Sequence, residues 1–389
     1  MKELNSLNDQ ELESFFDSFD QILTDITDVF WTISKNIPAA EDAIKSLKRL
    51  GKKVVVVCNN TTVPLDSHHK KFLSAGFDVD KDEIVTPTQI LISYLKKISL
   101  TKEIYVLGMP ALKEALAGAG FKLVQIGPEP LHETLAEWAR AGVINGDNIG
   151  AVVVDADLNL TYTNLQRAAD LLGDPEVVFV AGALDQRLPI GQDRAAISPG
   201  FFCKILEDMT GRVPLQLAKP GRLLGEYVEG KYKIEDSSRV LFIGDSIAED
   251  MEFASKYKKL LVLGGVTGKE ALEKWTFPEE YKPDYYVDNW KTVHDLICRI
   301  FENKLNRSFG GGRRDGNVNT TAMQLQKVFC RITEDMSFST KCGYKKLLVL
   351  SGLTKESLDR WIYPEEYKPD YYIDSLKDIH DLLLSLNQH

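Results

Sequence analysis

The stretch DITDVFWTISKNIPAAEDAIKSLKRLGKKVVVVCNN, residues 25–60, predicts a helix followed by a strand. Pro38 suits the first turn of a helix and Gly51 suits its end, and apolar residues recur every three positions between them. The β-branched run Val54–Val57 then predicts a buried strand. Because the apolar run Gln21–Thr24 precedes this stretch, the whole unit is a predicted strand, helix, strand crossover. Both strands end in polar residues, and ligand sites of open parallel sheets lie outside such carboxyl ends.

Apolar runs of strand length continue along the chain, with helical stretches between them. Alternating strands and helices are typical of an α/β fold, in which helices cover both faces of a mainly parallel sheet. The sequence therefore predicts such a fold. The further predicted strands are Glu103–Leu107, Ala151–Val154, Val177–Val180, Arg239–Ile243 and Lys259–Leu263.

The composition argues against several classes of partner. The 389 residues include 47 Lys and Arg against 57 Asp and Glu, a net charge of -10, and no dense basic run. Nucleic acids and anionic membranes are therefore not expected partners. The polar, acidic N-terminus is unlike a signal peptide, and no apolar run reaches the roughly 18 residues of a membrane span. These features predict a cytoplasmic protein.

An internal repeat marks the C-terminal part of the chain. Ile247–Met251 returns in altered form as Ile332–Met336, and Pro278–Tyr286 returns unchanged as Pro364–Tyr372. Glycines and charges between the copies, in Asn303–Met323, predict a flexible linker.

The second copy differs from the first where chemistry is expected, because Phe329-Cys330-Arg331 replaces Gly244-Asp245-Ser246. Three interpretations of the second copy are open. It is an appended half-module, the trace of a tandem-gene fusion, or a segment that competes with the first copy for one position in the sheet. A further interpretation is that the second copy is an oligomerisation or domain-swapping element, whose strands pair with the sheet edge of another chain.

Two polar pieces of sequence follow the strands of the first crossover. Asp25 stands at a strand end, where a carboxylate can attack phosphorus as a nucleophile and hold a metal. Cys58, Asn59 and Asn60 end the next strand with small polar groups and backbone amides that can bind phosphate oxygens. The simpler interpretations are that Asp25 is an ordinary turn residue and that Cys58, Asn59 and Asn60 form an Asn-rich turn.

Two more pieces lie near the end of the predicted fold. Lys219 precedes a proline turn, where its ammonium can neutralise a phosphate and its developing charge. The strand of Val240-Leu-Phe-Ile-Gly-Asp245 runs into a first carboxylate, and a second, Asp250, follows five residues later. Carboxylates are hard oxygen ligands of the kind that Mg²⁺ prefers.

These four pieces, in this order, resemble the four motifs of the haloacid dehalogenase-like (HAD) phosphatases, and their surroundings resemble the branch of 4-nitrophenylphosphatases and phosphoglycolate phosphatases. The resemblance covers roughly Phe19 to Ile300. It implies a Rossmann-like parallel-sheet core with an inserted α/β cap, a Mg²⁺ cofactor, an aspartyl-phosphate intermediate and a homodimer formed through the cap. On this basis residues 1–98 and 207–302 form the core, 99–206 the cap, 303–323 a linker and 324–389 the partial repeat.

The resemblance also carries residue roles, with Asp25 as nucleophile and Asp25, Asp245, Asp250 and the Thr27 carbonyl around the metal. Asn59, Asn60, Cys58 and Lys219 then surround the phosphate. Asp250 is alternatively the residue that orients metal-bound water or Lys219.

Three departures from the family pattern affect these roles. Family members carry an acid/base Asp and a Gly where this chain has Thr27 and Asp28, and a hydroxyl residue where it has Cys58. A threonine cannot transfer the proton, and a thiol is a weak donor. In the cap, Gly182-Ala-Leu-Asp185 replaces Thr-Asn-x-Asp. The predicted function is a Mg²⁺-dependent phosphatase of small phosphates with reduced activity; the alternative is a pseudophosphatase with a binding or regulatory role.

Two rival assignments remain. Asp155-Ala-Asp157 also follows an apolar strand, but it lies after the Asn-rich strand and inside cap-like sequence. Cys58 is a possible nucleophile, but the sequence offers it no Cys-x5-Arg loop and no evident His partner.

Overall fold

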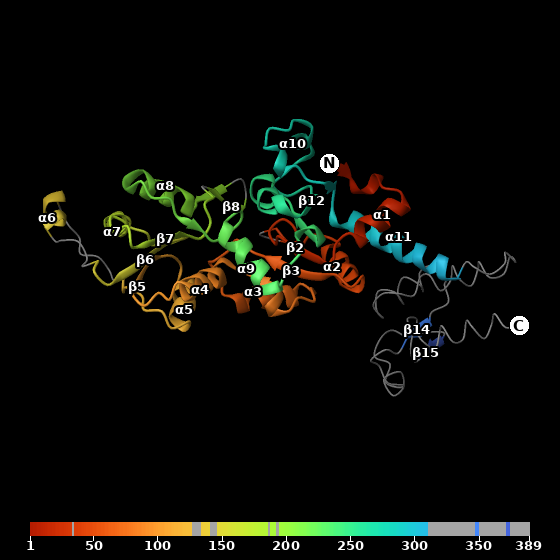
Figure 1. The fold of residues 1–389 in the computed structure, drawn as a ribbon, viewed down its shortest axis with the longest axis horizontal. Coiled ribbons are helices and arrows are strands. Elements are labelled where there is room, and N and C mark those ends of the chain that lie inside the picture. Colours follow the sequence, from red (N-terminus) through yellow and green to blue (C-terminus); the bar gives the residue numbers. More distant parts are fainter. Residues whose placement is uncertain are drawn as a thin grey trace, which may run out of the picture. The chain divides into compact units, whose positions relative to one another are not determined.

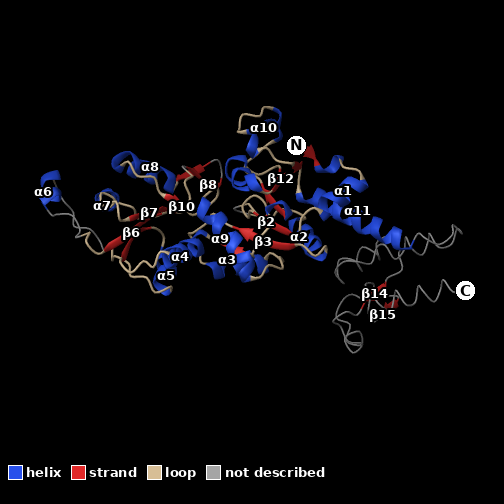
Figure 2. Cartoon of the chain, in the orientation of Figure 1, coloured by secondary structure: helices blue, strands red, loops and turns tan. Residues whose placement is uncertain are grey.

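The computed structural model describes residues 1–32, 35–126, 134–140, 146–185, 187–191, 194–309, 347–349 and 371–373 (Figure 1). Two compact units divide the chain, Met1–Cys298 and Arg299–His389. The first unit contains two parallel sheets with helices packed against them (Figure 2).

The main sheet has seven strands, and all of its pairings are parallel. The strand Gln21–Thr24 pairs on both sides, with Leu23 opposite Phe242 and Val55. The predicted α/β fold is confirmed, and the central strands place three candidate site segments at one edge. In sheet order the strands are β1 (Lys2–Glu3), β13 (Tyr285–Val287), β12 (Lys258–Val262), β11 (Val240–Gly244), β2 (Gln21–Thr24), β3 (Lys53–Val57) and β4 (Ile84–Val85).

The predicted crossover is present, with helix α2 (Ala40–Arg49) between β2 and β3. Gly51 follows the helix at φ +80°, a conformation that favours glycine and ends helices. Helix α1 begins at a capping box, in which Asn8 and Glu11 satisfy each other's backbone amides. The helices of this part are α1 (Asp9–Asp17), α2, α3 (Leu65–Ser74), α4 (Pro87–Lys97), α9 (Arg222–Tyr232), α10 (Lys269–Glu273) and α11 (Trp290–Phe309).

A second parallel sheet is inserted in the chain between β4 and β11, in the order β10 (Leu215–Gln216), β7 (Val178–Ala181), β6 (Ile149–Val154) and β5 (Glu103–Leu107). We call β5 to β10 with their helices the inserted unit. It also contains an antiparallel hairpin. The additional elements are α5 (Pro110–Gly118), α6 (Leu135–Arg140), α7 (Tyr162–Leu171), α8 (Pro199–Thr210), β8 (Arg187–Gly191) and β9 (Arg194–Ile197).

The inserted unit extends further along the chain than the boundary expected at residue 206. That boundary falls inside α8, which packs against β6 and α7, and β10 then pairs with β7. The difference arises because β10 has only two residues, too few to show a strand pattern.

One buried apolar cluster joins the two sheets. It includes Val57 and Phe242 of the main sheet, Val106 and Val153 of the inserted sheet, and Leu91 of α4. Burying side chains of this size contributes roughly 1.5–3 kcal/mol each. Packing therefore holds the loops of the inserted unit beside the strand ends of the main sheet.

The first residues of the linker expected at 303–323 are helical in the structure, because α11 continues to Phe309. In the C-terminal unit, β14 (Leu347–Val349) and β15 (Tyr371–Ile373) pair in parallel. Leu347 lies opposite Tyr371, the register that Leu260 and Tyr285 have in β12 and β13. The remaining residues of the predicted linker and repeat lie outside the described residues.

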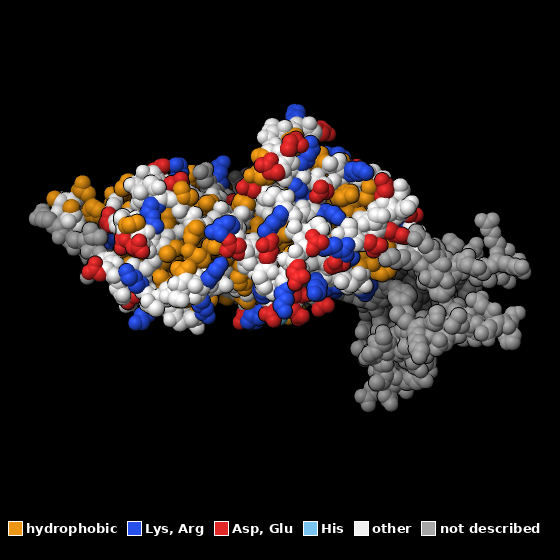
Figure 3. Space-filling view, viewed as in Figure 1, with side chains coloured by type: hydrophobic (Ala, Val, Ile, Leu, Met, Phe, Trp, Pro, Cys, Tyr) orange, Lys and Arg blue, Asp and Glu red, His pale blue; other side chains and the backbone are white. Residues whose placement is uncertain are grey.

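The described surface carries both acidic and basic side chains, as the composition predicts. Acidic and basic side chains are interspersed over the face of the described part shown in Figure 3. Within the described ranges, no helix is both long and apolar enough to cross a membrane. In the part of the chain that the structure describes, Cys58, Cys203 and Cys298 form no disulfide.

Candidate active site

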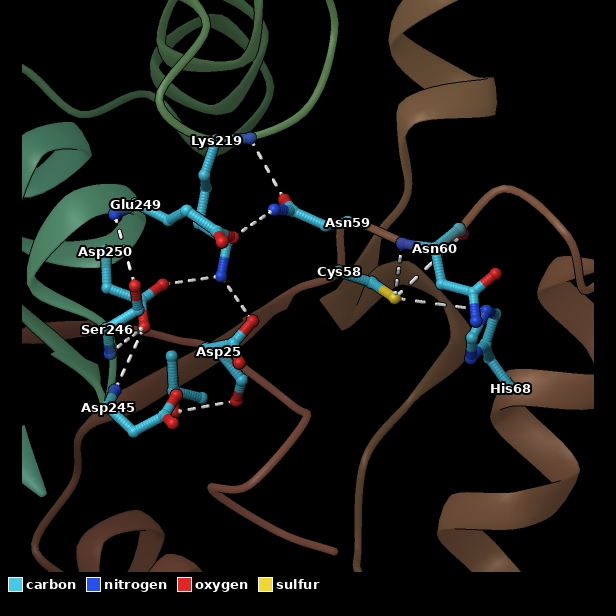
Figure 4. A network of polar contacts seen from close by, with 11 residues as sticks. Asp25, Cys58, Asn59, Asn60, His68, Lys219, Asp245, Ser246, Glu249 and Asp250 are labelled. Atoms are coloured by element: carbon cyan, nitrogen blue, oxygen red, sulfur yellow. Dashed lines mark hydrogen bonds and ion pairs between the residues drawn. The ribbon is translucent and has the colours of Figure 1, made fainter. Parts of the chain in front are cut away.

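Four segments far apart in the sequence meet at the carboxyl edge of the main sheet (Figure 4). Asp25 follows β2, Asn59 follows β3 and Asp245 follows β11. Lys219 enters from the segment after β10, the last strand of the inserted unit. This is the edge at which parallel sheets gather ligand sites.

Lys219 is the central cation of this cluster. Its side chain is 2% exposed, and its ammonium forms ion pairs with Asp25 and, at 2.6 Å, with Asp250 Oδ1. Burial opposes the charge, but the carboxylates of Asp25 and Asp250 outweigh it and hold the pKa of Lys219 above its usual range. Buried charges persist only when they are paired in this way. Lys219 is therefore a permanent cation at the floor of the site.

Asp250 organises the turn that follows β11. Its Oδ2 accepts hydrogen bonds of 3.0 Å from the backbone amides of both Asp245 and Ser246, while its Oδ1 binds Lys219. A Cβ atom on Gly244 would lie 2.3 Å from Asp250 Oδ2, so this close approach requires glycine. Both Asp250 oxygens are engaged, which favours its role of orienting Lys219 over that of a metal ligand.

Three carboxylates lie close enough to share a cation. Ligand atoms of Asp25, Asp245 and Asp250 all lie within 4.8 Å of one another. Burial, with Asp250 and Asp25 nearby, raises the pKa of Asp245 to about 8, and burial raises that of Asp25 to about 6 against the lowering effect of Lys219. Crowded buried carboxylates of this kind fit Mg²⁺, which neutralises them and prefers oxygen ligands.

Asn59 connects Lys219 to the loop after β3. Its Oδ1 accepts a hydrogen bond of 2.9 Å from the Lys219 backbone amide, and its Nδ2 donates one of 2.9 Å to Glu249 Oε2. The side chain that we expected to hold phosphate is thus occupied by protein groups. Glu249 itself was missed, although it precedes Asp250 in the motif, because its direction depends on the π-helical turn Ile247–Met251.

Cys58 and Asn60 point away from the carboxylates, toward His68 (Figure 4). Cys58 Sγ accepts a hydrogen bond from the Asn60 amide at 3.2 Å and lies 4.0 Å from His68 Nε2. The expectation that Cys58 has no His partner was therefore wrong. Burial nevertheless raises the pKa of Cys58 to about 12, so it remains a thiol and is a poor nucleophile.

The side chains of the remaining candidate residues lie outside the cluster of Lys219 and the three carboxylates. The Thr27 side chain is exposed in the loop after Asp25. Asn60 Oδ1 accepts hydrogen bonds of 2.7 Å from the amide and hydroxyl of Thr62, so it stabilises its own turn. Asp155 follows β6 in the other sheet and is not among the three carboxylates that lie within 4.8 Å of one another, which argues against the rival assignment.

Comparisons with known proteins agree with this geometry. Two family models match, haloacid dehalogenase-like hydrolase over residues 22–122 and HAD-hydrolase-like over residues 216–293. Phosphoglycolate phosphatase 2 of Arabidopsis thaliana is 30% identical over 299 residues, which cover 75% of this chain and 96% of that protein. The 4-nitrophenylphosphatase of Schizosaccharomyces pombe is 29% identical over a match that covers 72% of this chain and 95% of that protein. The fold is similar to p-nitrophenyl phosphatase from Archaeoglobus fulgidus, with TM-score 0.61, 23% identity, and coverage of 72% of this chain and 99% of that one.

Proposed function

Because the chain belongs to the haloacid dehalogenase-like hydrolases, with 4-nitrophenylphosphatases and phosphoglycolate phosphatases among its relatives, we propose that it is a Mg²⁺-dependent phosphatase of small phosphomonoesters. The observation that carries this proposal is the buried ion-pair network of Lys219 with Asp25 and Asp250, next to Asp245. This network places a nucleophile, Asp25, a fixed cation, Lys219, and a set of oxygen ligands for a metal at the carboxyl edge of the main sheet.

The residues support a two-step transfer. Asp25 attacks phosphorus, so that a bond forms to its carboxylate oxygen and the bond to the leaving alcohol breaks. Water then attacks phosphorus, releasing inorganic phosphate and restoring Asp25. Lys219 makes two of the three hydrogen bonds available to an ammonium, which leaves one for a phosphate oxygen. Mg²⁺ held by Asp25 and Asp245 would neutralise charge on the transferred phosphate.

Thr27 sets the expected rate. A hydroxyl cannot protonate the leaving oxygen or activate water near neutral pH, and loss of such a group costs about 10²–10⁴-fold. We therefore expect slow turnover, with the smallest penalty for 4-nitrophenyl phosphate, because 4-nitrophenolate leaves without being protonated.

The test follows 4-nitrophenol release and protein-bound, acid-labile phosphate in the presence of Mg²⁺. Wild type should show release or a phosphoenzyme that is absent from Asp25→Asn. Thr27→Asp should accelerate turnover, because it restores an acid/base carboxylate. Release that does not depend on Asp25 would exclude the proposed mechanism.

A second candidate function is a pseudophosphatase that binds but does not turn over. The observation that favours it is the hydrogen bond from Asn59 to Glu249, which occupies a side chain expected to hold phosphate, together with the exposed Thr27. Under this reading the Mg²⁺ and phosphate affinities persist, while neither Asp25→Asn nor Thr27→Asp changes the amount of product.

We further propose that the inserted unit is a cap and that it forms a homodimer through α8. Phe201, Ile205 and Met209 recur every four residues and are 41%, 47% and 61% exposed. Side chains spaced by four form one stripe on a helix. Ile205→Glu should therefore shift the chain to a monomer in light scattering, whereas Leu73→Glu, at an exposed leucine of α3, should not.

A further inference from the structure

A pocket separate from the candidate active site lies at the opposite edge of the main sheet. Lys2, Lys258 and Tyr285 line it, and they are the first residues of the parallel strands β1, β12 and β13. Asp25 and Asp245, in contrast, follow the carboxyl ends of their strands. The pocket has a volume of about 400 Å³, which is within the range of small-molecule sites.

Helix α1 forms the wall opposite these strand ends. Gln10, Ser14 and the C-cap residue Ser18 line the pocket and are spaced by four residues, so α1 turns one polar stripe toward it. Phe15 also lines the pocket, and its ring contacts the Tyr285 ring edge to face, with centroids 4.7 Å apart. The pocket therefore combines hydroxyl and amide groups with an aromatic wall.

Lys258 is a cation of this pocket without a counter-ion. Its side chain is half-buried, and its ammonium donates a hydrogen bond to the hydroxyl of Ser18, a neutral group. Among the residues that the structure describes, no carboxylate forms an ion pair with this ammonium. Burial lowers the pKa of Lys258 against the raising effect of Asp284, as expected for an ammonium that is desolvated without a direct partner. An anion in the pocket would supply the missing charge.

The other charged groups of the lining do not compensate Lys258. Lys2 adds a second ammonium, on a side chain that is 64% exposed, and its Nζ lies 3.7 Å from Glu11 Oε1. Glu11 is already engaged, because its Oε2 accepts a hydrogen bond of 3.1 Å from the Asn8 amide in the capping box. The lining thus has two cations and one anion, in a chain whose net charge is -10. Such a pocket favours an anionic ligand.

We propose that this pocket binds a small organic phosphate, with the phosphate group paired with Lys258 and the apolar part against Phe15 and Tyr285. Lysine ammonium groups bind phosphates as point charges. The volume leaves room for more than a phosphate ion, and the aromatic wall gives an organic part a surface to bury. The pocket shares no residue with the candidate active site, so the inference does not depend on the proposed phosphatase function.

The test measures the binding of adenosine monophosphate (AMP), inorganic phosphate and adenosine to the full chain by calorimetry. A chelator is present, because without metal the three carboxylates of the candidate active site repel a phosphate. AMP should bind more tightly than inorganic phosphate, which lacks the organic part, and more tightly than adenosine, which lacks the charge.

Variants of two lysines locate the binding. Lys258→Met keeps an extended side chain but removes the ammonium, and it should weaken AMP binding by about tenfold or more, because hydrogen bonds to charged groups are strong. Lys70→Met, at an exposed lysine of α3, should leave the affinity unchanged. AMP should also raise the Tm of wild type and not that of Lys258→Met.

Two further measurements separate binding from folding. Because Lys258 has no carboxylate partner, Lys258→Met should unfold at the same urea concentration as wild type or at a higher one. Strong destabilisation would show that the ammonium is structural and would overturn the proposal. Ser14→Trp should fill the pocket and block AMP while Lys258 stays in place. Ser74→Trp, at a serine that likewise bonds the backbone of its own helix, should not.

The remaining outcomes decide the ligand. An AMP affinity that Lys258→Met and Ser14→Trp leave unchanged, adenosine binding as tight as that of AMP, or no binding of AMP would overturn the proposal. Equal affinities for AMP and inorganic phosphate would overturn the choice of an organic phosphate. None of these measurements involves hydrolysis, so a failure here leaves the proposed phosphatase function untouched.

Discussion

Asp245→Asn should make the metal-free protein more stable while removing its stabilisation by Mg²⁺. Asp245 is 2% exposed, and burial raises its pKa from 3.8 to about 8. At pH 7 the Asp245 carboxyl group is therefore ionised in the unfolded chain and protonated in the folded, metal-free chain. Each pH unit between 3.8 and 7 then costs about 1.4 kcal/mol, or roughly 4 kcal/mol at most.

The sign of the pH dependence follows from the direction of the shift. Because folding raises the pKa of Asp245, the group's contribution to stability is fully present below pH 3.8 and is lost as the pH rises toward 8. Burial acts on Asp25 in the same direction, with a pKa of about 6. Metal-free wild type should therefore become less stable between about pH 4 and pH 8.

The variant isolates this contribution. Asparagine retains an oxygen that can accept the 2.7 Å hydrogen bond from the Val266 amide, but it has no charge to bury. Urea unfolding with a chelator at pH 7 should give a gain of about 2–4 kcal/mol. Excess Mg²⁺ should stabilise wild type and not the variant. A variant that is less stable than wild type without metal, or equally stabilised by Mg²⁺, would refute the reasoning.

Two further predictions concern the backbone. Asp28 has φ +58°, a conformation that favours glycine, so Asp28→Gly should raise the free energy of unfolding by about 0.5–1 kcal/mol, measured by urea titration. Gly244→Ala should push Asp250 off the loop amides and lower stability by roughly 2–3 kcal/mol, together with phosphatase activity. Gly230→Ala, in open space on α9, is its control and should stabilise by up to about 1 kcal/mol. Equal effects of the two alanines would contradict the steric account.

The strand ends of the site were predictable because they follow from a local pattern. The run Gln21–Thr24 matches β2 at both ends, the run Val54–Val57 ends where β3 ends, and the strand before Asp245 is displaced by one residue. Parallel pairing then brings the residues that follow these strands to one edge, whatever the rest of the chain does.

The contacts between these segments were not predictable. The Asn59 side chain bonds Lys219 and Glu249, which are 160 and 190 residues away in the sequence. Likewise, His68 approaches Cys58 only because α3 folds back over the loop after β3. Hydrogen bonds of this kind depend on side-chain direction and on the packing of the two sheets, neither of which leaves a periodic trace in the sequence.

One departure from the family pattern, Gly182, fits its surroundings closely. A Cβ atom on Gly182 would lie 2.0 Å from Asp155 Oδ2, so the glycine makes room for a buried carboxyl group. Its other oxygen, Oδ1, accepts a hydrogen bond of 2.6 Å from the Ala156 amide. Burial raises the pKa of Asp155 to about 6, so keeping this carboxyl group buried has a cost in stability. The fit of Gly182 to Asp155 therefore gives this departure a structural reason, because a larger residue at position 182 would displace the buried carboxyl group.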